Sequence, residues 1–290
     1  MTATPLLVLD HAVKRYGDFT LEVDLQVPPG TITALVGANG SGKTTAFRLA
    51  LGLVRPDSGT AMLLGAPAFG AAPAVRRQVV ATFADGAERA GITPNDLIAQ
   101  YRVFYPDFDA DGCRRLLERF ALPDGKPLRS YSTGMHATCQ VIMAICRRPR
   151  LLVLDEPTAG LDTVAREKIL DLLRGFMEEA GRSILVSSHD SRDIEGLCDD
   201  FHYLKDGRIR LHETVGRLRD DYGVLLLDET QMAGLDDTYV LARQRVPGGW
   251  RVLTDQRAFY RENMPGIQIE RGGIDGLVSV MEQGTSQGGR

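Results

Sequence analysis

The chain has 290 residues, of which 43% are hydrophobic and 25% charged, a composition typical of soluble globular proteins. Its 34 basic and 38 acidic side chains give a net charge of −4, which argues against a nucleic-acid-binding protein. The four cysteines show no CxxC spacing, and neither a basic, apolar leader nor an apolar run of ~20 residues is present, so we expect a cytosolic protein with reduced thiols.

Most of the first 219 residues predict strands that alternate with helices. The expected strands are two within 6–30 joined by a turn at 16–18, then 31–37, 60–65, 76–84, 151–156, 183–189 and a hairpin over 201–213. The expected helices of this part follow a glycine-rich loop within 37–53 and lie at 164–180 and 191–199. Residues 66–74 are rich in Ala, Pro and Gly and predict a loop. This alternation favours a mostly parallel sheet that is covered by helices.

Two segments depart from the alternation. Between residues 86 and 150 the apolar spacing is helical, with a helix start at Thr93-Pro94, and predicts a separate helical lobe. Beyond residue 220 the pattern changes to short strands at 222–229, 239–246 and 249–255, followed by a helix over 273–283 and a polar tail that we expect to be disordered. We therefore divide the chain into a domain over 1–219 and a small α+β extension over 220–290.

Residues 37–44 read GANGSGKT and fit the phosphate-binding pattern GxxxxGK[ST] between a strand and a helix. Glycines let backbone N–H groups turn toward phosphate oxygens without a Cβ clash, and the helix start adds partial positive charge. Lys43 is expected to reach the β- and γ-phosphates, and the Thr44 hydroxyl to ligate Mg²⁺. The residues expected to bind ATP here are Gly37, Asn39, Gly40, Ser41, Gly42, Lys43, Thr44 and Thr45.

A second motif, LLVLDEP over 151–157, places two acids at the end of a buried strand. Asp155 is expected to hold Mg²⁺, and Glu156 to act as general base toward the attacking water. Two acids that simply end a strand in solvent are the alternative, which the phosphate loop upstream makes less attractive. Together the two motifs predict a P-loop NTPase with ATP and Mg²⁺ as cofactors.

Further stretches narrow this class. They are Tyr16 before the phosphate loop, YSTGM over 131–135, AGLD over 159–162, and His189 at the end of the next strand. In order and spacing these motifs resemble the ATP-binding cassette (ABC) proteins, over about residues 5–215. The resemblance implies a P-loop α/β fold with a mostly parallel core sheet, an antiparallel β subdomain and a helical signature subdomain.

In that family two nucleotide-binding domains stack head to tail, so each ATP lies between the phosphate loop of one copy and the signature helix of the other. By resemblance, Ser132 and Gly134 face the γ-phosphate held by Lys43 of the second copy, and Asp162 crosses the dimer interface. Ser132 is also the expected N-cap of its helix, and both roles are compatible.

His189 and Tyr16 carry weaker signals. A lone His is more often structural, but the position of His189 after Asp155 and Glu156 favours, by resemblance, a catalytic contact to the γ-phosphate. Tyr16 is expected to stack on adenine, with packing in its turn as the alternative.

The chain also departs from the family. The family usually places Gln after the strand at 76–84, where this sequence has Ala84 followed by Asp85. The Ala84 side chain can bind neither Mg²⁺ nor the attacking water, and Asp85 could do so only if the loop is shifted by one residue. This departure affects the expected rate of hydrolysis and its coupling to the permease, and not ATP binding. The form YSTGM and the segments 104–109 and 273–281 resemble the subgroup that serves type-2 permeases, which includes many bacterial exporters.

Residues 107–118 also match the calcium-loop pattern DxDxDGx₅E. However, the helical spacing that starts near Ala110 places Glu118 well inside a helix, and Arg114 and Arg115 occupy positions that need an apolar residue and an oxygen ligand. We therefore expect Asp109 to cap a helix and not to bind calcium.

These observations predict the ATP-binding and ATP-hydrolysing subunit of a bacterial ABC transporter. It would dimerise with a second copy and drive a separately encoded permease, in export more than import, from the inner face of the cell membrane. The alternative is a soluble ABC ATPase without a transport role, or a slow nucleotide switch, for which the residues at 84–85 are the best support.

Overall fold

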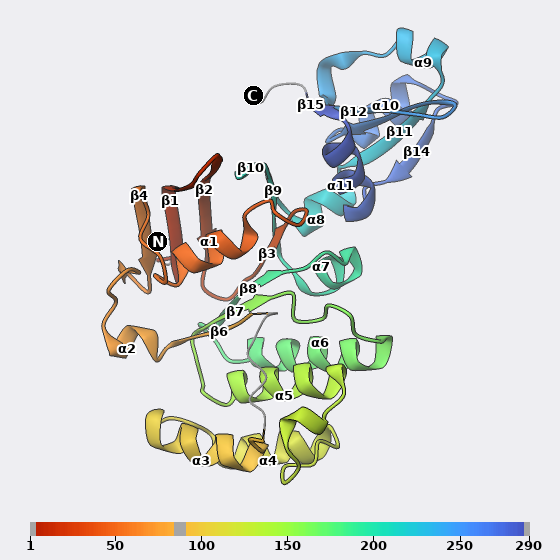
Figure 1. Ribbon diagram of the computed structural model, residues 1–290. Helices are drawn as coiled ribbons and strands as arrows, with labels where there is room; N and C mark the ends of the chain where they lie inside the picture. Colours follow the sequence, from red (N-terminus) through yellow and green to blue (C-terminus); the bar gives the residue numbers. More distant parts are fainter. Residues whose placement is uncertain (1–3, 84–90, 287–290) are drawn as a thin grey trace.

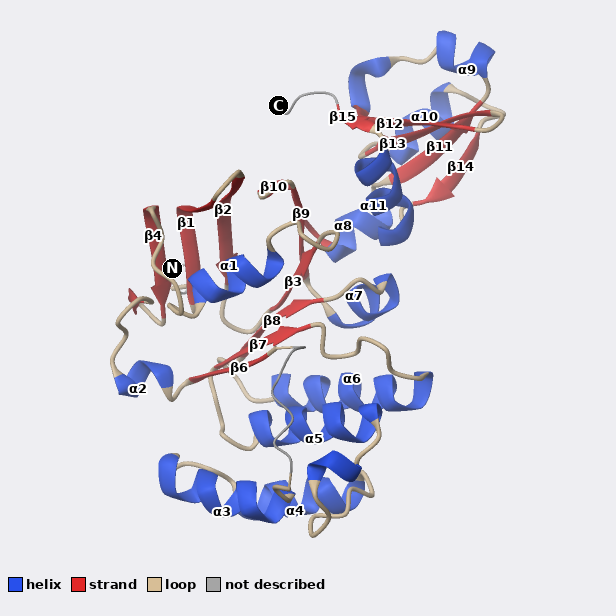
Figure 2. Ribbon diagram, viewed as in Figure 1, coloured by secondary structure: helices blue, strands red, loops and turns tan. Residues whose placement is uncertain are grey.

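The computed structural model describes residues 4–83 and 91–286. One ten-stranded sheet has the order β5-β4-β1-β2-β10-β9-β3-β8-β7-β6, and a second sheet has the order β14-β11-β13-β12-β15 (Figures 1 and 2). The first sheet ends in sequence at β10 (Arg208–Thr214), and the second begins at β11 (Gly223–Leu227), with helix α8 (Val215–Asp220) between them.

The N-terminal edge of the large sheet is antiparallel. It consists of β1 (Leu7–Tyr16), β2 (Phe19–Val27), β4 (Ser58–Leu63) and the short β5 (Ala66–Pro67). The turn at Gly17–Asp18 pairs Tyr16 with Phe19, as the sequence predicts. A parallel bridge between Glu22 of β2 and Arg208 of β10 joins this edge to the rest of the sheet.

The other half is the mostly parallel core. Its parallel strands are β3 (Ile32–Val36), β6 (Val79–Thr82), β7 (Leu151–Asp155), β8 (Ser183–Ser187) and β9 (Asp200–Lys205). Along β7, Leu152 and Leu154 pack in one apolar cluster with α5 (Thr133–Ile145) and α6 (Thr163–Met177), whereas Leu151 and Val153 pack in another with α1 (Lys43–Ala50). Because successive side chains point to opposite faces of a sheet, a strand covered on both faces has no polar position before its end.

A helical lobe lies below the core sheet in Figure 1. It contains α3 (Pro94–Phe104), α4 (Ala110–Arg119) and α5 (Thr133–Ile145), and α5 packs against α6 (Thr163–Met177). The sequence correctly places the start of α3, because Thr93 and Asp96 form a reciprocal capping box. Asp109 caps α4 by accepting a 2.8 Å hydrogen bond from the Gly112 N–H, and its other oxygen pairs with Arg148, so the capping interpretation of residues 107–118 is confirmed.

The C-terminal part forms the second sheet with its own helices. Its remaining strands are β12 (Val240–Val246), β13 (Gly249–Thr254), β14 (Gln268–Arg271) and β15 (Thr285–Ser286), and its helices are α9 (Glu229–Ala233), α10 (Arg257–Asn263) and α11 (Ile274–Gln283). Apolar residues of α11 belong to the same buried cluster as Phe201 and Tyr203 of β9. The extension is therefore packed on the large sheet.

Two polar side chains from outside the extension also cap the ends of α11. The N–H of Ile274 donates to Glu195 Oε1 at 2.8 Å, and Lys205 Nζ donates to the carbonyls of Met281 and Glu282 at 2.8 and 2.9 Å. Helix α11 has no side-chain cap of its own, since Gly273 precedes it. Glu195 lies in α7 (Ser191–Leu197), so helix α7 contacts the extension directly.

Two local predictions are wrong. Residues 66–74 are not entirely a loop, because Ala66–Pro67 pairs with β4 and Pro73–Arg76 forms the short helix α2. The tail is also not disordered from its start, because Thr285 and Ser286 pair with Arg243 and Ala242 of β12. Within the described residues, no helix has the length and hydropathy needed to cross a membrane.

Candidate nucleotide site

Three parallel strands bring the predicted motifs to one edge of the sheet. In β3, β8 and β7, which are neighbours, Leu35 is opposite Ser187, and Ser187 is opposite Asp155. The chain therefore leaves all three strands on the same side, where the phosphate loop, the segment after Ser187 and Glu156 lie together. Ligands of open α/β sheets bind at this edge, beyond the carboxyl ends of the strands.

The phosphate loop leads into a helix whose start is open to an anion. Helix α1 has no side-chain cap and no acid in its first turn, so its first N–H groups and its dipole are available to phosphate oxygens. Gly42 has a φ of 112°, which favours glycine. A Cβ on Gly37 would lie 2.2 Å from the Leu204 carbonyl oxygen, so this glycine is also required for packing against β9.

Lys43 and Ser41 supply the polar side chains of the loop. Lys43 Nζ donates to the carbonyl oxygens of Gly37 and Ala38 at 2.7 and 3.3 Å, and lies 3.9 Å from Glu156 Oε1. The Ser41 hydroxyl is buried without a hydrogen-bond partner among the described residues. A buried hydroxyl of this kind needs an acceptor, and a phosphate oxygen is one.

A set of oxygen atoms beside the loop fits Mg²⁺. The Thr44 hydroxyl donates to Asp155 Oδ2 at 3.2 Å, and Ser187 Oγ donates to Asp155 Oδ1 at 2.7 Å. Mg²⁺ prefers hard oxygen ligands and is commonly bound by one or two carboxylates together with substrate phosphates. The fold thus brings Thr44 and Asp155, which lie 111 residues apart in sequence, within hydrogen-bond distance of each other.

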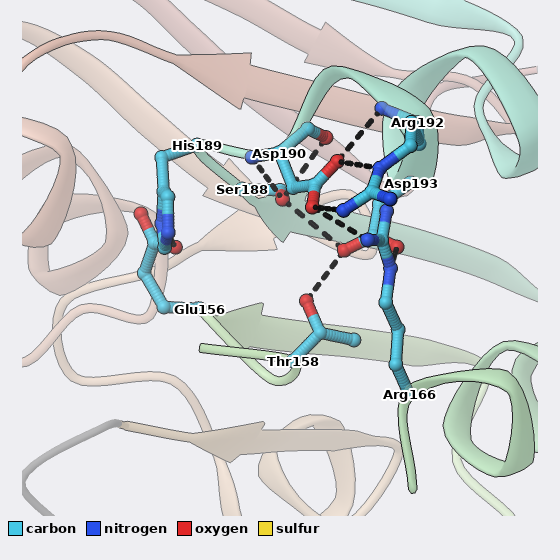
Figure 3. Close-up of polar contacts among 8 residues, drawn as sticks. All are labelled: Glu156, Thr158, Arg166, Ser188, His189, Asp190, Arg192 and Asp193. Atoms are coloured by element: carbon cyan, nitrogen blue, oxygen red, sulfur yellow. Dashed lines mark hydrogen bonds and ion pairs between the residues drawn. The ribbon is translucent and has the colours of Figure 1, made fainter. Parts of the chain in front are cut away.

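Glu156 and His189 face each other beyond the ends of β7 and β8 (Figure 3). His189 Nδ1 lies 2.6 Å from Glu156 Oε2, while the Glu156 N–H donates to Ser187 Oγ at 2.8 Å. Glu156 has a φ of 51°, a left-handed conformation that is uncommon for a residue other than glycine. Backbone conformations of this kind concentrate at functional sites, where the surrounding contacts hold them.

The signature residues form a second group. Ser132 caps α5 by accepting from the Met135 N–H at 3.3 Å, and Asp162 caps α6 by accepting from the Ala165 N–H at 2.8 Å. Ser132, Gly134 and Asp162 line one hollow of about 430 Å³, and the described residues around it include none of the phosphate loop. The hollow that holds Ser132, Gly134 and Asp162 is therefore distinct from the phosphate loop, although a second pocket of about 280 Å³ places Tyr131 and Thr133 beside Asp155 and Glu156.

The other predicted residues have varied positions. Tyr16 is 45% exposed, with Lys14 Nζ 5.7 Å from its ring centroid, so the ring is available for stacking. Asn39 is exposed and Thr45 half-buried beside the phosphate loop. Ala84 and Asp85 lie outside the described residues.

Sequence reasoning missed Ser187, which bonds both Asp155 and the Glu156 backbone. It also missed Arg166 and Asp193, which form a buried ion pair to one side of His189 (Figure 3). A signal for Ser187 existed, because strands 151–156 and 183–189 were both expected in a parallel sheet. No pattern in the sequence indicated the ion pair.

Comparison with known proteins identifies the family. Residues 21–159 match the model of the family described as "ABC transporter". The chain is 32% identical over 251 residues to the ABC transporter ATP-binding protein YtrB of Bacillus subtilis, covering 86% of this chain and 82% of that protein. It is 35% identical over 224 residues to the Nod factor export ATP-binding protein I of Cupriavidus metallidurans, covering 71% of this chain and 70% of that protein.

A solved structure agrees with this result. The structure described as an ATP-binding subunit of an ABC transporter superposes with a TM-score of 0.67 at 28% identity, covering 74% of this chain and 92% of the other. The motifs, their placement at one sheet edge and these likenesses lead to one conclusion: the chain belongs to the family of ATP-binding subunits of ABC transporters, and it is an ABC transporter ATPase.

Proposed function

We propose that this subunit hydrolyses ATP between two copies of the chain, with Glu156 and His189 as its catalytic pair. The observation that carries the proposal is the meeting of Lys43, Thr44, Asp155 and Glu156 at one sheet edge, with His189 2.6 Å from Glu156. Glu156 accepts a proton from the attacking water, and His189 contacts both Glu156 and the γ-phosphate.

Lys43 neutralises the β- and γ-phosphates, and the amide groups at the start of α1 hold them. The Thr44 hydroxyl and the Asp155 carboxylate hold Mg²⁺, which supplies charge stabilisation of the phosphoryl group when bound. Ser187 orients the Asp155 carboxylate from the opposite side. Tyr16 provides a face for adenine, since nearly half of its surface is exposed.

The second copy supplies the other half of each site. Support comes from the hollow lined by Ser132, Gly134 and Asp162, which is separate from the phosphate loop of the same chain. The N–H groups at the start of α5 then face the γ-phosphate held by Lys43 of the other copy. Dimer closure consequently depends on the γ-phosphate, and hydrolysis opens the dimer.

We further propose that the dimer drives a separately encoded permease of the type-2 class from the inner face of the membrane, in the direction of export. The name of the Cupriavidus protein, which states export, supports this direction. Residues 1–219 form the cassette and residues 220–290 an accessory extension. A role outside transport gains no support, because the relatives are named as transporter subunits.

The test of the hydrolytic role is Glu156→Gln. Loss of the general base slows single-turnover hydrolysis by at least ~10²-fold, while Mg·ATP causes dimers to accumulate in light scattering. Glu167→Gln, on the exposed part of α6, is the matched control and retains the wild-type rate, because within residues 4–83 and 91–286 its side chain pairs only with Arg174, at 3.7 Å.

Two results contradict the proposal. Wild-type turnover in Glu156→Gln removes this residue from the mechanism. A protein that stays monomeric with Mg·ATP, even as Glu156→Gln, removes the head-to-tail dimer. Co-purification of a permease from membranes tests the transport partner separately.

A further inference from the structure

A group of charged residues, buried at its centre, lies beside the Glu156–His189 pair (Figure 3). Its centre is Arg166 of α6, which is 8% exposed. Arg166 Nε donates to Asp193 Oδ1 at 2.5 Å, and Arg166 Nη1 donates to Asp190 Oδ2 at 2.5 Å. One guanidinium thus holds two carboxylates of the same segment in a fixed orientation, which its planar geometry suits.

The same carboxylates connect to both catalytic segments. Thr158, two residues after Glu156, donates from its hydroxyl to Asp193 Oδ2 at 2.5 Å. Asp190 directly follows His189, and its N–H donates to Ser188 Oγ at 3.1 Å. We call Thr158, Arg166, Asp190 and Asp193 the Arg166 cluster. The cluster joins the strand end that carries Glu156 to the strand end that carries His189.

His189 depends on this connection for its position. Its side chain is 67% exposed, and the structure gives it one side-chain partner among the described residues, Glu156. Few contacts therefore restrain the ring, and the backbone on either side of it sets where the ring lies. That backbone is held at Asp190, which accepts from Arg166 and caps α7.

Because the Arg166 cluster holds buried charges, loss of one charged member is expected to change its structure. The guanidinium of Arg192, followed by that of Arg166, keeps the pKa of Asp190 well below its ordinary value. Asp193 is only 5% exposed, and Arg166 is its cationic partner in the described chain. Removing one partner of a buried ion pair leaves an uncompensated charge, so the segment 188–193 must move toward water.

We propose that Arg166 is a positioning residue for hydrolysis: through Asp190 and Asp193 it holds His189 against Glu156. This inference rests on the proposed function, in which both of those residues act on the γ-phosphate. Arg166 itself does not contact either residue, and its effect passes through the backbone of residues 188–190. The competing interpretation is a cluster that stabilises the fold and has no influence on the reaction.

The first experiment measures single-turnover hydrolysis of Mg·ATP, with the purified chain in molar excess over ATP. In Arg166→Gln the rate falls by about 10- to 100-fold, the loss expected from misplacing a catalytic group by about an ångström, while ATP affinity changes by less than about 2-fold. Arg174→Gln removes the same charge from an exposed position of the same helix, and it retains the wild-type rate.

The decisive comparison is made in a His189→Ala background. If Arg166 acts through His189, Arg166→Gln causes little further loss there. An equal fold-loss in both backgrounds, or an unchanged rate with lowered melting temperature, overturns the proposal. Thr158→Val, which removes one hydrogen bond to the Asp193 carboxylate but no charged group, gives the same pattern with a smaller loss and serves if Arg166→Gln does not fold.

A second readout does not depend on hydrolysis. In histidine-labelled protein, Glu156→Gln shifts the ¹³Cε1 resonance of His189, because the two side chains are in contact. In Arg166→Gln this response disappears, whereas in Arg174→Gln it remains, and a response that survives Arg166→Gln overturns the proposal. If the wild-type chain does not hydrolyse ATP, or His189→Ala keeps the full rate, the proposed function fails, and the resonance still decides whether Arg166 holds His189 against Glu156.

Discussion

Gly134 has two possible reasons to lack a side chain, and they can be separated by experiment. The proposed function needs a bare backbone at the start of α5, so that the second copy's γ-phosphate can approach. The fold needs one as well, because a Cβ on Gly134 would lie 2.8 Å from the Cβ of Ala165 in α6. We therefore consider Gly134→Ala together with the compensating change Ala165→Gly.

The structure sets the size of the packing effect. Ordinary contact between two methyl groups requires roughly 3.5 to 4 Å, so α5 and α6 must separate by the better part of an ångström. Overpacking of this kind costs about 1–3 kcal/mol, and replacing a helical Gly by Ala returns up to about 1 kcal/mol. We expect Gly134→Ala to lower the free energy of unfolding by about 1–2 kcal/mol. In the double variant the clash is absent, and stability returns to within about 1 kcal/mol of wild type.

The assay combines urea unfolding of the single and double variants with single-turnover hydrolysis. If the bare backbone serves the phosphate, the double variant regains stability but stays slow, with weakened ATP-dependent dimerisation. Recovery of both stability and rate would mean that Gly134 serves only helix packing. A Gly134→Ala variant as stable as wild type would refute the packing argument itself.

The remaining predictions concern the extension and pH. Glu195→Ala removes the side chain that accepts from the Ile274 N–H, so amide hydrogen exchange in α11 should quicken by an amount equivalent to about 1 kcal/mol. Lys205→Met should have the same effect at the other end of α11. Unchanged exchange in both variants would contradict the role of these side chains in holding α11. Burial lowers the pKa of His202 to about 4, so the unfolded chain binds a proton first as the pH falls below about 6.5, and stability is lost from there down to about pH 4. Between pH 7 and 5 the free energy of unfolding falls by about 2 kcal/mol from this cause. Urea unfolding of His202→Phe should show a smaller change over that range than the wild type. An identical pH dependence in both proteins would contradict the lowered pKa of His202.

Local chemistry explains which parts of the fold were predictable. The helix starts at Thr93, Asp109 and Ser132 depend on side chains that bond backbone groups three positions away, and the structure has a capping box at the first and N-caps at the other two. The short strand β5 and helix α2 escaped prediction because they span only two and four residues and lie among Pro and Gly, which usually mark turns. Their structure follows from pairing with β4 and from the position of the chain between two sheet halves.

The site shows the same division at longer range. The phosphate loop and the acids Asp155 and Glu156 were predictable, because their chemistry is written in contiguous residues. Ser187 and the Arg166 cluster were missed, because their partners lie 24 to 35 residues away in sequence. The expected parallel strands 151–156 and 183–189 gave a signal for Ser187, whereas nothing of this kind pointed to the Arg166 cluster. In the sequence of an amphipathic helix, a buried Arg cannot be told from an exposed one, because its carboxylate partners are known only from the fold. The residues expected to contact the phosphates are thus predictable from sequence motifs. The residues that hold them in place are found only once the packing of α6 and α7 against the sheet is known.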